Sequence, residues 1–230
     1  MRWNDLWMGR SAVIAVGFCV VIAAPTVLAQ SKKSAKQSAS LEKTGEASKA
    51  AVEDVLTSCG NLLAGYNSII DGTAKDSQKA YKKLVGDLKS TEKKLDGARK
   101  QVASLSKEAD KFFKAWEQDL QSISSESLRD KSSGRMEDAK KRYAELGEIL
   151  TSASNEFTPV MQNLNDQILY LGRDLSPEAI ADLADEAAEL NAQAEAATTK
   201  VKEMLETAGK TQAAADAELE STEETTDDSE

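Results

Sequence analysis

Apolar residues recur along most of the chain at alternating steps of three and four positions, which is the spacing of one face of an α-helix. The first stripe predicts a helix over residues 41–70. Asp71-Gly72 should end it, because glycine tolerates the left-handed conformation that closes a helix. The stripe consists of Leu41, Ser48, Val52, Val55, Cys59, Leu62, Tyr66 and Ile69.

The second segment, residues 75–124, carries a clear seven-residue repeat with polar residues between the apolar ones. Successive heptads of this kind predict a long coiled-coil helix, about 75 Å at 1.5 Å per residue. The positions seven apart are Tyr81, Leu88, Leu95, Val102, Ala109, Trp116 and Ile123, and between them lie Leu84, Thr91, Ala98, Leu105 and Phe112.

The repeat resumes over residues 136–171, where Pro159 predicts a kink near Asn155 because proline removes one backbone hydrogen bond. Ser176-Pro177-Glu178 predicts the start of a further helix, which continues to residue 209. Serine caps a helix, proline fits its first turn, and glutamate suits the positive end of its dipole.

The connections between these helices are short, so consecutive helices are expected to be antiparallel neighbours. We therefore predict an all-α fold, an elongated antiparallel coiled coil or four-helix bundle over residues 41–210. The second and third helices should fold back around residues 126–131, which brings the aromatic side chains together. The predicted core contains Cys59, Leu88, Leu95, Val102, Leu105, Phe112, Trp116, Tyr143, Leu146, Leu150, Phe157, Leu164, Leu183 and Leu190.

Residues 1–29 have the layout of a secretory signal peptide: a modestly basic start, an apolar run and small residues at its end. The predicted cleavage lies between Ala29 and Gln30. The alternative is an uncleaved anchor formed by residues 11–29, a length that just spans a bilayer. Lysines follow this run, whereas basic residues favour the cytoplasmic side, which argues against a simple anchor.

Two polar segments flank the predicted helices. Residues 30–40 contain lysines and serines but no large apolar residue, and we interpret them as a flexible linker. Residues 211–230 hold eight acidic residues and no basic one, which predicts a disordered acidic tail. A solubilising role suits such a tail, and collecting Ca²⁺ or a basic partner is the alternative.

Few residues in the chain suit catalysis or metal binding. It has no histidine, the commonest general base and metal ligand, and Cys59 is the one cysteine beyond the signal segment. Phosphate-binding loops and nucleophile elbows are absent from the sequence. We therefore expect no enzyme activity, no cofactor and no metal site.

Charge restricts the partners further, because the chain carries a net charge of −10, which makes nucleic acid an unsuitable partner. The charge is shared unevenly. Residues 75–126 hold 12 basic and 9 acidic groups, and residues 177–210 hold 3 basic and 8 acidic groups. Complementary charge could decide which helices pair, or it could capture a basic partner segment.

Several short motifs resemble the bacterial domain-of-unknown-function family DUF2959. They are Lys114-Ala-Trp-Glu-Gln-Asp-Leu, Ser127-Leu-Arg, Tyr143-Ala-Glu-Leu, Phe157-Thr-Pro-Val-Met and Asp166-Gln-Ile-Leu-Tyr-Leu. The resemblance spans about residues 41–209 and implies a helical envelope protein, with no activity or binding site to carry over. The chain departs from the family pattern at Gly172-Arg173-Asp174 and lacks a lipoprotein cysteine, which argues against membrane attachment.

Together these features predict an exported, non-enzymatic coiled-coil protein that serves as a structural or adaptor element of a bacterial envelope. Its partners would be envelope proteins. The alternative is a periplasmic holdase that grips unfolded proteins between long helices, which would require exposed apolar surface. Because heptad seams can be satisfied within one chain or between copies, the sequence leaves a homo-oligomer open.

Overall fold

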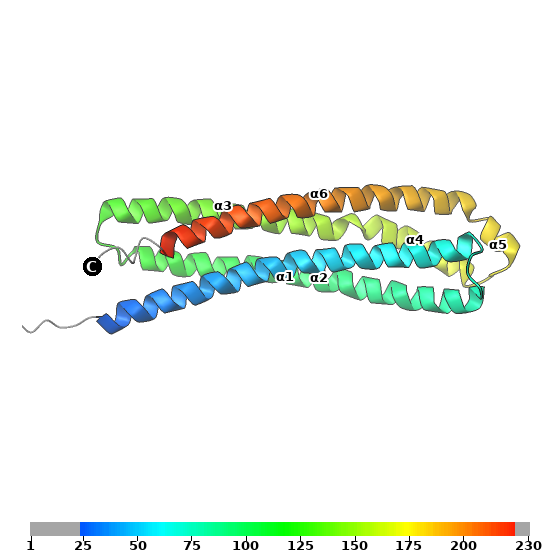
Figure 1. Cartoon of the computed structure of the whole chain (residues 1–230), viewed down its shortest axis with the longest axis horizontal. Helices are drawn as coiled ribbons and strands as arrows, with labels where there is room; N and C mark the ends of the chain where they lie inside the picture. The colour runs from blue at the N-terminus through cyan, green and yellow to red at the C-terminus, as the bar shows by residue number, and fades with distance from the viewer. Residues whose placement is uncertain (1–23, 224–230) are drawn as a thin grey trace, which may run out of the picture.

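The helices form an elongated four-helix bundle (Figure 1). The computed structural model describes the backbone of residues 24–223 and the side chains of residues 34–217. Within that part of the chain the regular structure is helical throughout, with no strand. The predicted all-α fold is confirmed.

Four long antiparallel segments make up the bundle, and a short helix joins the last two. The third segment consists of two helices in line. The elements are α1 (Ala24–Ile70), α2 (Ser77–Leu120), α3 (Glu126–Glu156), α4 (Thr158–Leu171), α5 (Pro177–Ala181) and α6 (Ala184–Glu223).

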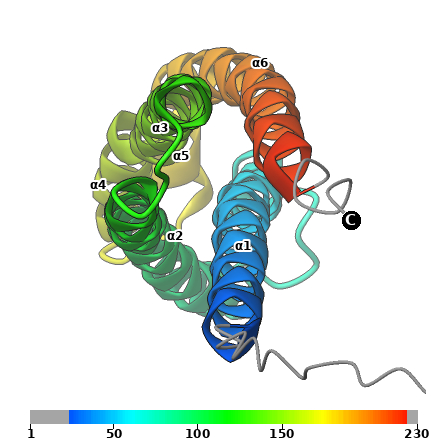
Figure 2. The same ribbon diagram turned by 90° about the vertical axis from the view of Figure 1, so that its left-hand side faces the viewer.

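Seen along its axis, the bundle follows the ring order α1, α2, α3 with α4, then α6 (Figure 2). Helices α2 and α6 therefore lie diagonally across the bundle and do not pair. The idea that complementary charge joins the basic segment 75–126 to the acidic segment 177–210 is wrong. Every helix carries an apolar stripe, and the stripes pack into one common core without deciding by themselves which helices are neighbours.

Local chemistry explains where the helices begin and end. The carboxylate of Asp76 accepts a 3.0 Å hydrogen bond from the backbone N–H of Lys79 and caps α2. Ser176 caps α5 in the same way, and Pro177 fits its first turn as expected. The continuous helix predicted from this start to residue 209 is wrong, because α5 ends at Ala181 and α6 begins at Ala184. Gly72 closes α1 with a φ of 65°, a conformation that glycine adopts without steric cost.

The third segment is interrupted at Phe157, close to the kink predicted near Asn155. Side chains of two neighbouring helices hold this interruption. Arg99 of α2 donates to Asn155 at 3.0 Å and to the Thr158 hydroxyl at 2.8 Å. Lys200 of α6 forms a 2.8 Å ion pair with Glu156. The interruption is therefore a fixed feature of the bundle.

Residues 30–40 are helical, so the prediction of a flexible linker is wrong. Helix α1 begins at Ala24 and passes through this segment without a break. Ser38 is buried, and its hydroxyl donates to Glu42 at 3.1 Å. Alanine, lysine and glutamine are good helix formers, and the helix that follows propagates into them at little cost.

The predicted disordered tail is also helical over most of its length, because α6 continues to Glu223. Gln212 and Ala215 are buried between the helices. Residues 224–230 lie outside the described part of the chain. Small side chains account for this outcome, since alanine has the highest helix propensity and lets neighbouring helices approach closely.

The predicted core residues all lie on the inward face of the bundle, and all but Trp116 are buried. Trp116 is only partly buried and packs on the edge of the core. Its indole N–H donates to the Ser132 hydroxyl at 3.1 Å, near the start of α3. Placing it fully in the core was incorrect, because α3 begins at Glu126 and gives the indole a polar neighbour.

Candidate functional site

A polar cluster centred on Gln167 lies inside the apolar core and joins three helices. Its amide oxygen accepts a hydrogen bond from the Tyr66 hydroxyl of α1. Its amide nitrogen donates to Asn163 at 2.9 Å and to the backbone carbonyl of Glu186 in α6 at 3.2 Å. Burial, aided by the charge of Glu186, raises the pKa of Tyr66 to about 12. The cluster is neutral and hydrogen-bonded, which limits the cost of burying it.

Asn67 and Asn191 form a second polar contact one residue further along α1. Each amide donates to the oxygen of the other, at 2.9 and 3.1 Å, across the α1–α6 interface. A half-buried amide pair of this kind satisfies both of its hydrogen bonds only in one register. These contacts therefore fix how α6 lies along α1.

A third polar contact lies in the half of the bundle that contains the chain termini. The Tyr143 hydroxyl of α3 donates to Asp216 of α6 at 2.7 Å. Gln212, one turn earlier, donates to the backbone carbonyl of Glu42 in α1 at 3.2 Å. The last turns of α6 are thus bonded to two different helices.

The acidic surroundings of Asp216 change its ionisation. Burial raises the pKa of this carboxyl, and the charges of Glu42 and Glu46 raise it further. Hydrogen bonds from Tyr143 and Gln212 act in the opposite direction. The pKa of Tyr143 is raised well above its usual range, chiefly by burial, so its hydroxyl stays protonated and donates at neutral pH.

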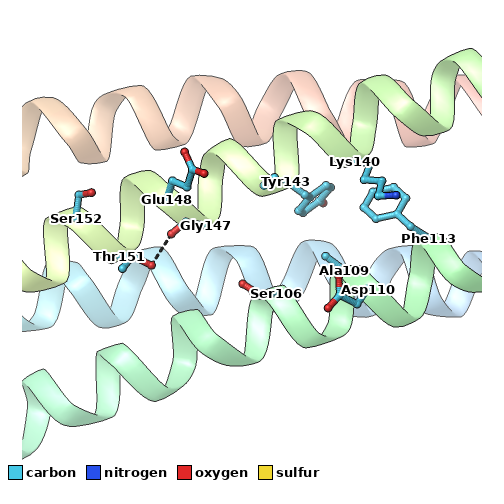
Figure 3. Close-up of a pocket in the computed structure, with 11 residues that line it drawn as sticks. Ser106, Ala109, Asp110, Phe113, Lys140, Tyr143, Gly147, Glu148, Thr151 and Ser152 are labelled. Carbon is cyan, nitrogen blue, oxygen red and sulfur yellow. Dashed lines mark hydrogen bonds between the residues drawn. The ribbon is translucent and has the colours of Figure 1, made fainter.

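A groove lies between α2 and α3. We call it the α2–α3 groove; its volume is about 590 Å³. Phe113 and Tyr143 lie toward one end and Thr151 toward the other, where the Thr151 hydroxyl donates to the Gly147 carbonyl at 2.7 Å (Figure 3). It is lined by Ser106, Ala109, Asp110, Phe113, Lys140, Tyr143, Ala144, Gly147, Glu148, Thr151 and Ser152.

The groove offers aromatic packing and hydroxyl groups to a bound molecule. Its charged side chains, Asp110, Lys140 and Glu148, are exposed to solvent. Acid–base catalysis requires an ionisable group with a matched pKa in a closed site. Burial raises the pKa of Tyr143 well above its usual range and keeps this lining side chain neutral.

The aromatic side chains near this groove pack on one another. Phe113 meets Tyr143 edge to face with ring centres 6.1 Å apart, and Phe112 meets Trp116 similarly at 5.7 Å. Phe113 also stacks on Trp116 at 6.3 Å. The cluster joins α2 to α3 through the contact of Phe113 with Tyr143, as the folding-back of these helices predicts.

Cys59 is buried on the inner face of α1, and this burial raises the pKa of its thiol to about 12. A thiol with such a pKa is protonated at neutral pH and is a weak nucleophile. Among the described residues, no three His, Cys, Asp or Glu side chains lie close enough together to hold a metal ion.

The predicted cleavage residues Ala29 and Gln30 lie in the first turns of α1. The apolar run that precedes them lies almost wholly outside the described residues. Of the helices in the described part of the chain, none is long and apolar enough to cross a membrane.

The sequence analysis missed Gln167, Gln212 and Asp216. The two glutamines lie one step from seam residues, Gln167 between Leu164 and Leu171, and Gln212 between Ala208 and Ala215. The three-and-four spacing could have located them, because it continues through both. Asp216 carries no such signal, since an aspartate in an acidic segment looks like any surface carboxylate.

Comparison with known proteins gives one result. A family model described as "Protein of unknown function (DUF2959)" matches residues 32–214, in agreement with the resemblance seen in the sequence motifs. This match includes most of the segment interpreted as a linker and the first residues of the predicted tail. No curated protein and no solved structure matches the chain.

Proposed function

The chain belongs to the DUF2959 family, and from that premise we propose that it is an exported, non-enzymatic spacer or adaptor of the bacterial envelope. In this role it holds envelope proteins at a fixed separation. The length of the bundle suits the role, since the 47 residues of α1 span about 70 Å at 1.5 Å per residue.

The placement of exposed apolar side chains carries the proposal. Among the described residues, the exposed large hydrophobic side chains are Leu128, Leu169 and Tyr170. Leu128 lies in the first turn of α3, and the other two lie in the last turn of α4. These turns are at opposite ends of the bundle (Figure 1). Single exposed apolar side chains are common on soluble proteins, so the support for the proposal is that, among the described residues, the large ones are restricted to the two ends of the bundle.

The same placement disfavours a holdase. A chaperone that grips unfolded chains needs apolar surface along its helices, but here the stripes pack against one another. The sides of the bundle are mostly polar, and the α2–α3 groove is small beside an unfolded polypeptide. We therefore keep the holdase as the alternative.

Site-specific photo-cross-linking in living cells tests the proposal. A photoreactive amino acid replaces Leu128 or Leu169 at the ends, or Ala196 on the exposed middle of α6 as the control. We expect one or two envelope proteins in stoichiometric amount from the end positions and none from Ala196. A broad set of unfolded exported proteins would support the holdase and contradict the adaptor.

Export has its own test, the mass of the protein purified from cells. We expect a chain that begins at Gln30. An intact chain that begins at Met1 would contradict cleavage and favour the anchor formed by residues 11–29.

A further inference from the structure

A row of lysines runs along the outer face of α2. The row lies opposite the apolar seam, at every seventh position, so its side chains point away from the core along the whole helix. Glycine occupies one position of the row, and every lysine in it is exposed. We call these residues the lysine row: Lys79, Lys93, Lys100, Lys107 and Lys114, with Gly86 in register.

The lysines of this row make no ion pair with any described residue. Other basic residues on the same helix do: Lys83 pairs with Asp87 and Lys111 with Glu108. Lys94 reaches across to Asp54 of α1 at 2.9 Å. The charges of the lysine row are thus unsatisfied within the bundle, whereas its neighbours are partly neutralised.

The outward positions of α2 are strongly basic as a whole, although the chain carries a net charge of −10. Ten lysines of α2 are exposed, and four exposed acidic residues lie among or beside them. The lysines are Lys79, Lys82, Lys83, Lys89, Lys93, Lys94, Lys100, Lys107, Lys111 and Lys114; the acidic residues are Glu92, Asp96, Asp110 and Glu117. An acidic protein therefore presents one basic side.

We propose that this basic side of α2 binds the surface of an anionic lipid bilayer, with the bundle lying on its side. Residues seven apart rise about 10.5 Å, so the row from Lys79 to Lys114 extends for about 52 Å. A partner for such a row must be long, flat and negatively charged. A bilayer meets these conditions without any match of spacing, because its headgroups are mobile in the plane.

The gain in membrane partitioning expected for each lysine agrees with binding to a lipid surface. Each lysine close to an anionic bilayer raises the partition coefficient about fivefold, and several act together on one straight face. The attraction fades within a Debye length, about 8 Å at physiological salt, so only side chains at the outer face contribute.

A second copy of the chain fits the row less well. The diagonal helix α6 exposes six acidic residues, but three exposed lysines lie among or beside them. The acidic residues are Asp185, Glu186, Glu189, Glu195, Glu203 and Glu206, and the lysines are Lys200, Lys202 and Lys210. Glu206 already pairs with Lys210 at 2.7 Å. Exposed ion pairs add little, and two chains of like net charge repel each other. Self-association through these faces is therefore an alternative outcome of the test.

Vesicle binding by the purified full chain tests the inference. The vesicles contain either 30% phosphatidylglycerol in phosphatidylcholine or phosphatidylcholine alone. The row variant carries Lys93→Glu, Lys100→Glu and Lys107→Glu. The matched control carries Lys43→Glu, Lys131→Glu and Lys202→Glu, which change the net charge equally at exposed positions off α2. Circular dichroism verifies that both variants remain folded.

We expect the wild-type chain and the control variant to bind the anionic vesicles far more strongly than the neutral ones. The row variant should lose this preference, with a fall in partitioning on the order of a hundredfold or more. In 0.5 M salt the preference of the wild-type chain should shrink markedly.

Three results would overturn the inference. Equal binding to both vesicle types would mean that the lysine row takes no part. Equal losses in the two variants would mean that only net charge matters. Salt-sensitive dimers or larger assemblies in sedimentation, abolished in the row variant, would assign the row to a second copy. Vesicle binding is measured with purified protein, and the end contacts are measured by cross-linking in cells. Either result can therefore fail while the other holds.

Discussion

The Tyr143 hydroxyl donates a 2.7 Å hydrogen bond to the carboxylate of Asp216, which joins the middle of α3 to the end of α6. The bond spans 73 positions of sequence and holds a segment that composition alone describes as a disordered tail. The burial of Ala215 beside it shows that the same turn also contributes to the core.

Replacing Tyr143 with phenylalanine tests the strength of this bond. We expect the free energy of unfolding to fall by about 1–3 kcal/mol, because the substitution removes one of the two hydrogen-bond donors of a half-buried carboxylate. Urea titration measures the change. Asp216→Asn and the double variant complete a cycle, in which additive effects would show that the two side chains do not interact.

The ionisation of Asp216 predicts a pH dependence of stability. Its folded pKa lies above the ordinary 3.8, so this group stabilises the folded state fully below the unfolded pKa. The contribution is lost as the pH rises through the folded pKa. The difference in the free energy of unfolding between the wild-type chain and Asp216→Asn, measured from pH 4 to pH 7, should therefore be largest near pH 7. A difference that does not change with pH would contradict the raised pKa.

Truncation tests whether the end of α6 belongs to the fold. Ending the chain before Thr211 removes buried Gln212 and Ala215 and the partner of Tyr143. We expect a loss of about 2–4 kcal/mol, which corresponds to several degrees in Tm for a chain of this size. Ending it after Glu223 is the control and should leave Tm unchanged. Equal Tm values for both truncated chains would support the disordered tail.

Gly172 leaves room for the Tyr81 hydroxyl at the end of α4, and a Cβ at position 172 would overlap that oxygen. Gly172→Ala should cost about 1–3 kcal/mol by overpacking. Combining it with Tyr81→Phe should restore part of the loss, because the second change removes the clashing atom. Gly60→Ala is the matched control: nothing lies within 4 Å of its Cβ, and a small gain is expected. Calorimetry measures the Tm of the wild-type chain, of Gly172→Ala, of the double variant and of Gly60→Ala. A double variant no more stable than Gly172→Ala alone would contradict this contact.

Cys59 should resist thiol reagents in the folded protein. Its thiol is buried with a pKa of about 12, so little thiolate exists at neutral pH. We expect slow labelling by a chromogenic disulfide in buffer and rapid labelling in concentrated urea. Rapid labelling without urea would show that α1 opens readily.

The periodic part of the fold could be predicted from sequence because burial follows the heptad positions. Leu88, Leu95 and Val102 are seven apart and all buried, as the repeat requires. The break in the third segment could be predicted in the same way, since Pro159 excludes one backbone hydrogen bond.

The linker and the described part of the tail predicted at the ends of the bundle are helical instead. Their polar composition suggests disorder, whereas the three-and-four spacing of their small residues indicates a helix. Ala208 and Ala215 are seven apart and both buried, so the stripe of α6 continues beyond residue 209. Small residues bury little area each, which makes such a stripe easy to mistake for a polar tail. The ring order of the helices and the bond between Tyr143 and Asp216 depend on pair contacts that no periodicity encodes.

The number of chains in the folded particle is the measurement that tests the account most directly. The adaptor proposal requires that the apolar stripes of one chain pack only against one another, because only then are the sides of the bundle polar. Sedimentation equilibrium over a wide concentration range should give the mass of one chain. A stable mass of two chains down to the lowest concentration would contradict an adaptor that acts as one closed chain.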